Sequence, residues 1–171
     1  MAARLGTACF RRLRKILPVT VNNYIISAKN SKMMKRFEIV DHTADISIKA
    51  YGKSLKELYE SAAFGMFNIL ADLEGIRPST GIELNLEAPD REELLIEWLD
   101  ELLYNFYTKQ IIFCEFDITD LTDKTLSARV KGRFVGENKN RLKTEIKAAT
   151  RHDLHIKKKD DIYEVRIVFD V

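Results

Sequence analysis

Asp41, His42 and Asp45 lie within the stretch Asp41-His42-Thr43-Ala44-Asp45, and side chains of these types can bind a cation or move a proton. Apolar and polar residues alternate over 37–51, which predicts one strand with a single face on a core. Aspartate is depleted from strands because it favours turns and resists burial. Two aspartates on the polar face therefore break a local rule, and such breaks often mark functional sites.

A third carboxylate stands at the other end of the sequence. Asp170 falls on the polar face of the last predicted strand, and Val171 adds a terminal carboxylate beside it. If this strand lies next to Asp45, the carboxylates meet, and oxygen-rich clusters suit calcium or magnesium better than zinc. Lys147, on the polar face of a strand expected over 142–149, can balance that charge or bind an anion.

Plainer interpretations of these residues remain open. Asp41 and Asp45 can cap backbone groups in a turn, and His42, which falls on the apolar face, can be a hydrogen-bonded core histidine. We expect His152 and His155, in a polar loop, to face solvent.

Charge is distributed unevenly along the 171 residues. Residues 1–36 carry nine of the 28 basic residues and no acidic one, so 37–171 carry 19 basic and 26 acidic residues, a net charge of −7. This charge argues against the domain itself being a nucleic-acid binder, because binding of phosphates requires a basic face. The basic leader resembles an organellar transit peptide, but it also fits a tail that touches RNA or membrane, or a non-native start before Met33-Met34.

The lengths of the apolar runs and the two cysteines narrow the class of protein. No apolar run approaches the roughly 18 residues of a membrane span. Cys9 and Cys114 are far apart and form no CxxC, so neither a disulfide framework nor a thiolate zinc site is indicated, and a reduced, cytoplasmic setting is the simplest expectation. We divide the chain into a basic extension, 1–33, expected to be poorly ordered, and one domain, 34–171.

Two helices and several strands are predicted for that domain. Ser54 and Asp90 begin capping boxes, each followed by an apolar stripe at helical spacing. The acidic residues of the second helix indicate a solvated face, and Trp98 and Tyr104 are interpreted as core or helix-surface residues rather than a base-stacking platform. The pattern predicts an α+β fold from duplicated β-α-β-β units, with two helices on a mostly antiparallel, barrel-like sheet.

Three stretches resemble the archease family: the start from Met34 to Ile46, which contains His-Thr-Ala-Asp; Thr144-Glu145-Ile146-Lys147-Ala148-Ala149-Thr150; and the ending Val168-Phe169-Asp170-Val171. The resemblance covers about 34–171. It implies an accessory protein of the RtcB-type RNA ligase, which seals tRNA halves after intron removal. Such a protein is not itself an enzyme; it promotes guanylylation of the ligase at its active-site histidine and repeated turnover.

The resemblance also implies a cation site and a partner. Asp45, Asp170 and the terminal carboxylate of Val171 correspond to the ligands of a divalent cation, calcium before magnesium or manganese, and Lys147 to a functional lysine. The expected partner is the ligase, with tRNA met only through it and no membrane involved. Arg151 departs from the family, which often has an aromatic residue there, and the basic leader is atypical.

Two other functions compete with this one. The first is a metal-dependent phosphohydrolase or nuclease that uses Asp41, Asp45, Asp170 and a histidine, although no general base is clearly placed beside a second metal. The second is a chaperone-like binding module with the basic leader as its contact arm.

Overall fold

The computed structural model describes residues 20–21, 24–25, 34–41 and 46–171. The order is β1 (Thr20–Val21), β2 (Tyr24–Ile25), β3 (Met34–Lys35), β4 (Phe37–Asp41), β5 (Ile46–Gly52), α1 (Leu55–Leu70), β6 (Thr80–Glu87), α2 (Arg91–Lys109), β7 (Ile111–Leu121), β8 (Thr125–Phe134), the 3-10 helix η1 (Gly136–Arg141), β9 (Ala148–Thr150), β10 (Lys157–Lys159) and β11 (Ile162–Asp170).

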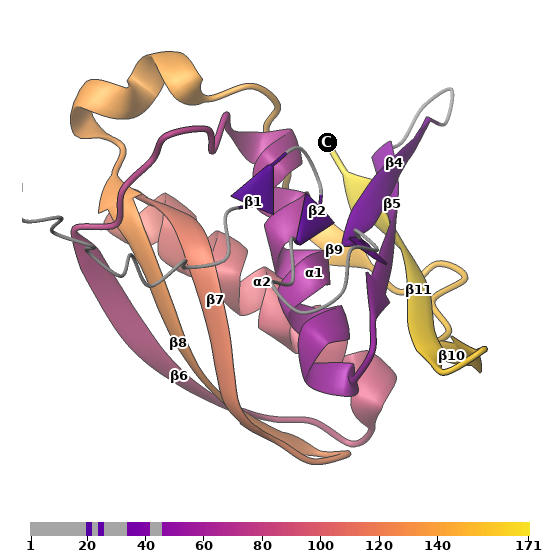
Figure 1. The fold of residues 1–171 in the computed structure, drawn as a ribbon. Coiled ribbons are helices and arrows are strands. Elements are labelled where there is room, and N and C mark those ends of the chain that lie inside the picture. Colours follow the sequence, from indigo (N-terminus) through magenta and orange to yellow (C-terminus); the bar gives the residue numbers. More distant parts are fainter. Residues whose placement is uncertain (1–19, 22–23, 26–33, 42–45) are drawn as a thin grey trace, which may run out of the picture.

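The strands form three antiparallel sheets. One joins β10, β11, β5 and β4 in that order, with β9 also paired to β11; another joins β6, β8 and β7; the short β1, β2 and β3 form the third. Helix α1 packs on β5 on one side and on β7 on the other, so it lies between the two larger sheets (Figure 1). The predicted α+β class, with two helices and antiparallel strands, is confirmed, although the two larger sheets do not close into a barrel.

Both helices begin where their caps predict. The Ser54 hydroxyl accepts the Glu57 N–H, the Glu57 carboxylate accepts the Lys53 N–H, and the Asp90 carboxylate accepts the Glu93 N–H. Such caps contribute about 1 kcal/mol each because they satisfy amide groups that have no partner inside the helix. The apolar stripes of α1 and α2 are buried, and Trp98 is fully covered. None of the described helices is long and apolar enough to cross a membrane.

The single strand predicted over 37–51 is wrong. β4 and β5 are two strands paired antiparallel, with Val40 opposite Ser47 and Asp41 opposite Ile46. Ser47, predicted on a solvated face, is fully buried, and its hydroxyl donates to the Val40 carbonyl at 2.9 Å. The predicted inner positions Ile48 and Ala50 are buried.

The strand predicted over 142–149 is also largely wrong. Only Ala148–Thr150 form a strand paired with β11. Further back, the Lys143 N–H donates to the Leu70 carbonyl at the end of α1. The predicted loop at 136–140 is the 3-10 helix η1.

From the sequence, Gly132 is expected to break its strand and Gly65 to pack closely on a neighbouring backbone, and both expectations are wrong. Gly132 does not break β8; it lets the strand pass so close to β7 that a methyl group would overlap the Ile112 carbonyl. Gly65 packs against side chains rather than a backbone, since a Cβ there would lie 2.8 Å from Cδ1 of Ile48 and 3.1 Å from the ring of Phe37.

Candidate functional site at the end of β11

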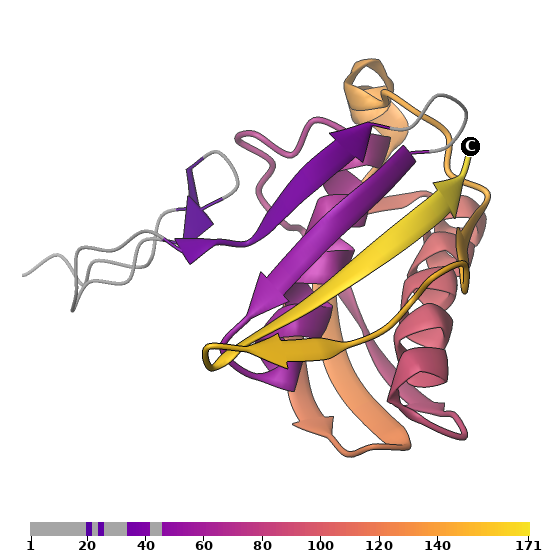
Figure 2. The same cartoon turned by 90° about the vertical axis from the view of Figure 1, so that its right-hand side faces the viewer.

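The last residues of β11 present Asp170 to solvent beside a buried aromatic ring. Phe169 pairs with Ile46 of β5 and is fully buried, whereas Asp170 pairs with Ala148 of β9 and is exposed. Side chains alternate across a strand, so burial of Phe169 directs the Asp170 carboxylate outward. Figure 2 shows this end of β11, close to the label C, beside the strands β4 and β5.

Lys147 joins Asp170 and Val171 in one polar cluster. The Lys147 N–H donates to the Asp170 carbonyl at 2.8 Å. Its ammonium donates to the Val171 oxygen at 2.8 Å and lies 3.9 Å from Oδ1 of Asp170. The structure therefore brings together three predicted site residues, although Lys147 immediately precedes β9 instead of lying within a strand. Both charged side chains are largely exposed, so the ion pair itself adds little to stability.

Three other predicted site residues fall at the edge of the described residues or outside them. Asp41 ends β4, opposite Ile46, and the placement of its side chain is not described. His42 and Asp45 lie outside the described residues. Ile46, which follows Asp45 in sequence, pairs with Phe169, the residue before Asp170. Participation of Asp41, His42 and Asp45 in the site stays a prediction.

The donors of the cluster suit a hard cation in kind. The Asp170 carboxylate and the Val171 oxygen are oxygen ligands, as calcium and magnesium prefer. The ammonium of Lys147 lies on the same oxygens, so a bound cation would compete with it. Within 34–41 and 46–171, no group of three or more His, Cys, Asp or Glu side chains is arranged to hold a metal. A cation would therefore need further oxygen ligands, which Asp45 or water can supply.

The acidic side of α2 anchors the segment that carries Lys147, and this was missed from the sequence. Asp100 accepts the Ala149 N–H at 2.8 Å, and Glu92 accepts the Ile156 N–H at 3.3 Å. Glu93 forms an ion pair with Arg151. The predicted solvated face is therefore wrong for these three acids. A run of acids on a helix does not reveal which of them meets a backbone amide from another segment.

Burial and nearby groups shift the pKa of Asp100. Burial raises the pKa of this carboxyl group, the nearby Glu97 raises the pKa further, and the Ala149 N–H and Arg151 oppose the rise. On the same helix, the Tyr107 hydroxyl donates to the Ile146 carbonyl at 2.8 Å. Two side chains of α2 thus hold the main chain on either side of Lys147.

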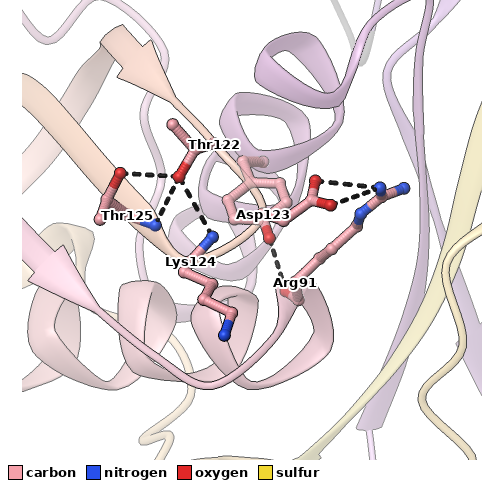
Figure 3. Close-up of polar contacts among 6 residues, drawn as sticks. Arg91, Thr122, Asp123, Lys124 and Thr125 are labelled. Atoms are coloured by element: carbon pink, nitrogen blue, oxygen red, sulfur yellow. Dashed lines mark hydrogen bonds and ion pairs between the residues drawn. The ribbon is translucent and has the colours of Figure 1, made fainter.

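A second polar cluster joins the start of α2 to the turn between β7 and β8 (Figure 3). Arg91 pairs with Asp123 at 2.9 Å, and Thr122 bonds to the N–H groups of Lys124 and Thr125 and to the Thr125 hydroxyl. A cleft of about 360 Å³ lies beside these residues. The ion pair and hydrogen bonds hold the turn against the helix, so we assign this cluster to the architecture.

The remaining candidates for chemistry are less promising. His152 and His155 are exposed, as predicted. Burial raises the pKa of the Cys114 thiol to about 11, so this thiol stays protonated at neutral pH and is a poor nucleophile. Trp98 belongs to the core and Tyr104 is exposed on the surface of α2, so both lie where they were predicted.

Known proteins match nearly all of the described domain. A model of the archease protein family matches residues 37–171. The archease of Methanosarcina barkeri is 38% identical over 145 residues, which are 82% of this chain and 99% of that protein. The archease of Sulfolobus acidocaldarius is 37% identical over 139 residues, which are 81% of this chain and 100% of that protein.

Two solved structures share the fold. The solution structure of Methanobacterium thermoautotrophicum protein 1598 has a TM-score of 0.69 and 32% identity, and the match covers 81% of this chain and 100% of that one. The crystal structure of an archease from Thermotoga maritima, named a possible chaperone, has a TM-score of 0.54 and 26% identity, and the match covers 77% of this chain and 94% of that one.

Proposed function

This chain belongs to the archease family, and from that premise we propose that it is a non-catalytic accessory protein of an RtcB-type RNA ligase. It promotes guanylylation of the ligase and its repeated turnover in tRNA splicing, in the cytoplasm. The observation that carries the proposal is the cluster of Lys147, Asp170 and Val171. The family resemblance implies a function for each of these three residues, and they lie in contact with one another.

In this proposal Asp45, Asp170 and the terminal carboxylate of Val171 hold a divalent cation, with calcium preferred over magnesium or manganese. The exposed carboxylate of Asp170 at the end of a rigid strand supports that role. When bound, such a cation would supply concentrated positive charge at the edge of an otherwise acidic domain. Asp41 and His42, next to Asp45 in sequence, would support the same site.

Lys147 has a distinct role in the proposal. Its ammonium, held by the Val171 oxygen, keeps a positive charge beside Asp170, where it can orient a phosphate of the nucleotide used by the ligase. The surrounding domain has a net charge of −7 over 37–171, which favours a basic groove on the partner and a salt-dependent association. RNA would then reach the complex through the ligase.

The test is a guanylylation assay with the full chain. The protein is mixed at a substoichiometric ratio with an RtcB-type ligase, GTP and a divalent metal, and covalent guanylylation of the ligase is followed over time. We expect acceleration that is lost in Asp170→Ala. Asp120→Ala, which removes an exposed aspartate from β7 in the other sheet, is the matched control and should stimulate as well as the wild type.

Stimulation by Asp170→Ala at the wild-type level would remove the proposed site. Turnover of a model phosphodiester by this protein alone would favour the phosphohydrolase or nuclease instead. The chaperone-like alternative has support from the name of the Thermotoga maritima relative. It predicts that the ligase gains solubility or thermal stability with no change in its initial rate of guanylylation.

A further inference from the structure

Exposed apolar side chains gather at one end of the molecule. Five large hydrophobic residues of the described chain are exposed, and four of them belong to the C-terminal half of α2, the end of β8 and the segment after η1. They are Tyr104 (62% exposed), Tyr107 (38%), Phe134 (55%) and Leu142 (41%). Exposed aromatic residues near one another commonly mark a binding surface.

Main-chain and side-chain bonds place these residues around the end of α2. The Val135 N–H donates to the carbonyl of Gln110, the C-cap of α2, at 2.7 Å, and Phe134 pairs with Ile111, the first residue of β7. On the other side, the Tyr107 hydroxyl bonds to the Ile146 carbonyl. η1 arches from the end of β8 toward the segment before β9, and Figures 1 and 2 both show it at the same end of the molecule as the C-terminal end of β11.

The same end carries positive charge. Residues 133–147 hold five basic and two acidic residues, whereas the other residues of 37–171 hold 14 basic and 24 acidic ones. Lys109, Arg133, Lys139 and Lys143 are exposed and form no ion pair with any other described residue. The acids of this end are few: the charge of Glu145 adds to burial in raising the pKa of Tyr107, and Asp170 is paired with Lys147. The net charge of the domain therefore conceals a basic end.

From this combination we propose that the basic-aromatic end, defined by Tyr104, Phe134, Lys109, Arg133, Lys139 and Lys143, binds single-stranded RNA directly. Unpaired bases stack on exposed aromatic rings, and lysines and arginines beside the rings contact the phosphates. Protein interfaces also bury exposed aromatic residues; the choice of RNA rests on the combination of these rings with basic side chains that form no ion pair with another described residue. The inference adds a direct RNA contact to the proposed function and does not rest on it.

The basic-aromatic end lies close to the candidate site at the end of β11. Lys147 follows Ile146, whose carbonyl accepts the Tyr107 hydroxyl, and precedes β9, so the cluster at the end of β11 begins next to the C-terminal part of α2. A strand of RNA on the basic-aromatic end would extend toward Asp170 and Lys147. An accessory protein arranged in this way could hold an RNA end while its partner is being activated.

The experiment measures binding of a fluorescein-labelled, unstructured 12-nucleotide RNA to the full chain by fluorescence anisotropy, with no ligase present. We expect Lys139→Gln with Lys143→Gln to weaken binding about tenfold near 0.1 M salt and to reduce the slope of log K against log salt by about 1.4, because two phosphate contacts are lost. Tyr104→Ala should weaken binding about tenfold, and Tyr104→Phe should retain it, because stacking needs the ring and not the hydroxyl.

Two controls separate this surface from other basic segments. Lys157→Gln with Lys159→Gln removes two exposed lysines from β10 and should change the affinity less than twofold. Arg11→Gln, Arg12→Gln and Arg14→Gln together test the basic leader, which can bind RNA through charge alone. With that leader variant as background, the loss caused by Tyr104→Ala should persist.

The proposal is overturned if the leader variant is the only one with reduced affinity for RNA. It is also overturned if the β10 variant loses as much affinity as the variant with both Lys139→Gln and Lys143→Gln, or if Tyr104→Phe loses as much affinity as Tyr104→Ala. Equal affinity for duplex RNA would also overturn it, because paired bases cannot stack on the rings. All the substituted side chains named for the basic-aromatic end are exposed, and circular dichroism with thermal unfolding verifies that each variant is folded. Failure of RNA binding would leave the guanylylation result unaffected, and the reverse also holds.

Discussion

Acidic residues on α2 and on the sheet of β6, β8 and β7 look alike in sequence, yet those of the sheet pair with basic side chains and Asp100 of α2 binds a backbone N–H. On the sheet, Glu83 lies 3.2 Å from Arg129 and Glu115 lies 3.5 Å from Lys131, and all four side chains are mostly exposed. On α2, Asp100 is half-buried and accepts a backbone N–H from another segment. Each sheet pair joins two exposed side chains, whereas the α2 contact fixes a backbone amide.

The difference shows how charge contributes to positioning a site. An exposed ion pair gains little because water competes for both partners and salt screens them. A buried amide that loses its acceptor costs more because nothing replaces the lost hydrogen bond. The Asp100 contact also lies two residues from Lys147, so it holds the cluster at the end of β11 in addition to stabilising the fold.

The largest expected effect is that of Asp100→Ala. This change leaves the Ala149 N–H, in a largely buried residue, without an acceptor, and we expect it to lower the free energy of unfolding by about 1–3 kcal/mol in urea denaturation. Glu97→Ala, an exposed acid on the same helix, is the control and should change it by less than about 0.5 kcal/mol. Equal losses of unfolding free energy for the two variants would contradict the claim that Asp100 is special because it accepts a backbone N–H.

A smaller effect with a definite sign comes from the acidity of Asp100. Because burial raises its pKa in the folded protein, the folded state holds this proton more tightly than the unfolded state. Its contribution is fully present below the unfolded pKa, near 3.9, and is lost as pH rises through the folded pKa. The free energy of unfolding of the wild type, relative to Asp100→Asn, should therefore fall as pH increases above about 4.

Asp100→Asn is the suitable reference because the amide oxygen can still accept the Ala149 N–H while carrying no titratable proton. Chemical denaturation of both proteins at half-unit steps from pH 4 to pH 7 measures the difference. A difference that increases with pH would mean that Arg151 and the Ala149 N–H outweigh burial at this carboxyl group.

The sequence was sufficient for the elements whose cause is local. Ser54 and Asp90 predicted both helix starts, because capping needs only a side chain and an amide three residues away. The alternation of Ile82, Leu84 and Leu86 predicted β6, since one face of that strand packs on the core.

The errors occurred where the cause is distant in sequence. Alternation over 37–51 does not show that the chain reverses between Asp41 and Ile46, although aspartates favour turns. Leu142 and Thr144 alternate like a strand, but no neighbouring strand pairs with them, because Lys143 bonds to the end of α1. Alternation indicated that Lys147 can balance the charge near Asp170, but only if their segments lie close together, and the pairing of β9 with β11 cannot be predicted from either segment alone.

The smallest expected effect is that of Arg129→Ala on the three-stranded sheet. The change removes the ion pair with Glu83, and we expect the free energy of unfolding to change by less than about 0.5 kcal/mol, because both side chains are mostly in solvent. The same denaturation experiment, repeated near 0.5 M NaCl, should bring the variant and the wild type closer, since salt screens what remains of the attraction. A loss of unfolding free energy as large as that of Asp100→Ala would mean that the sheet pair also fixes backbone geometry. The acids of α2 and of the sheet would then differ only in how deeply they are buried.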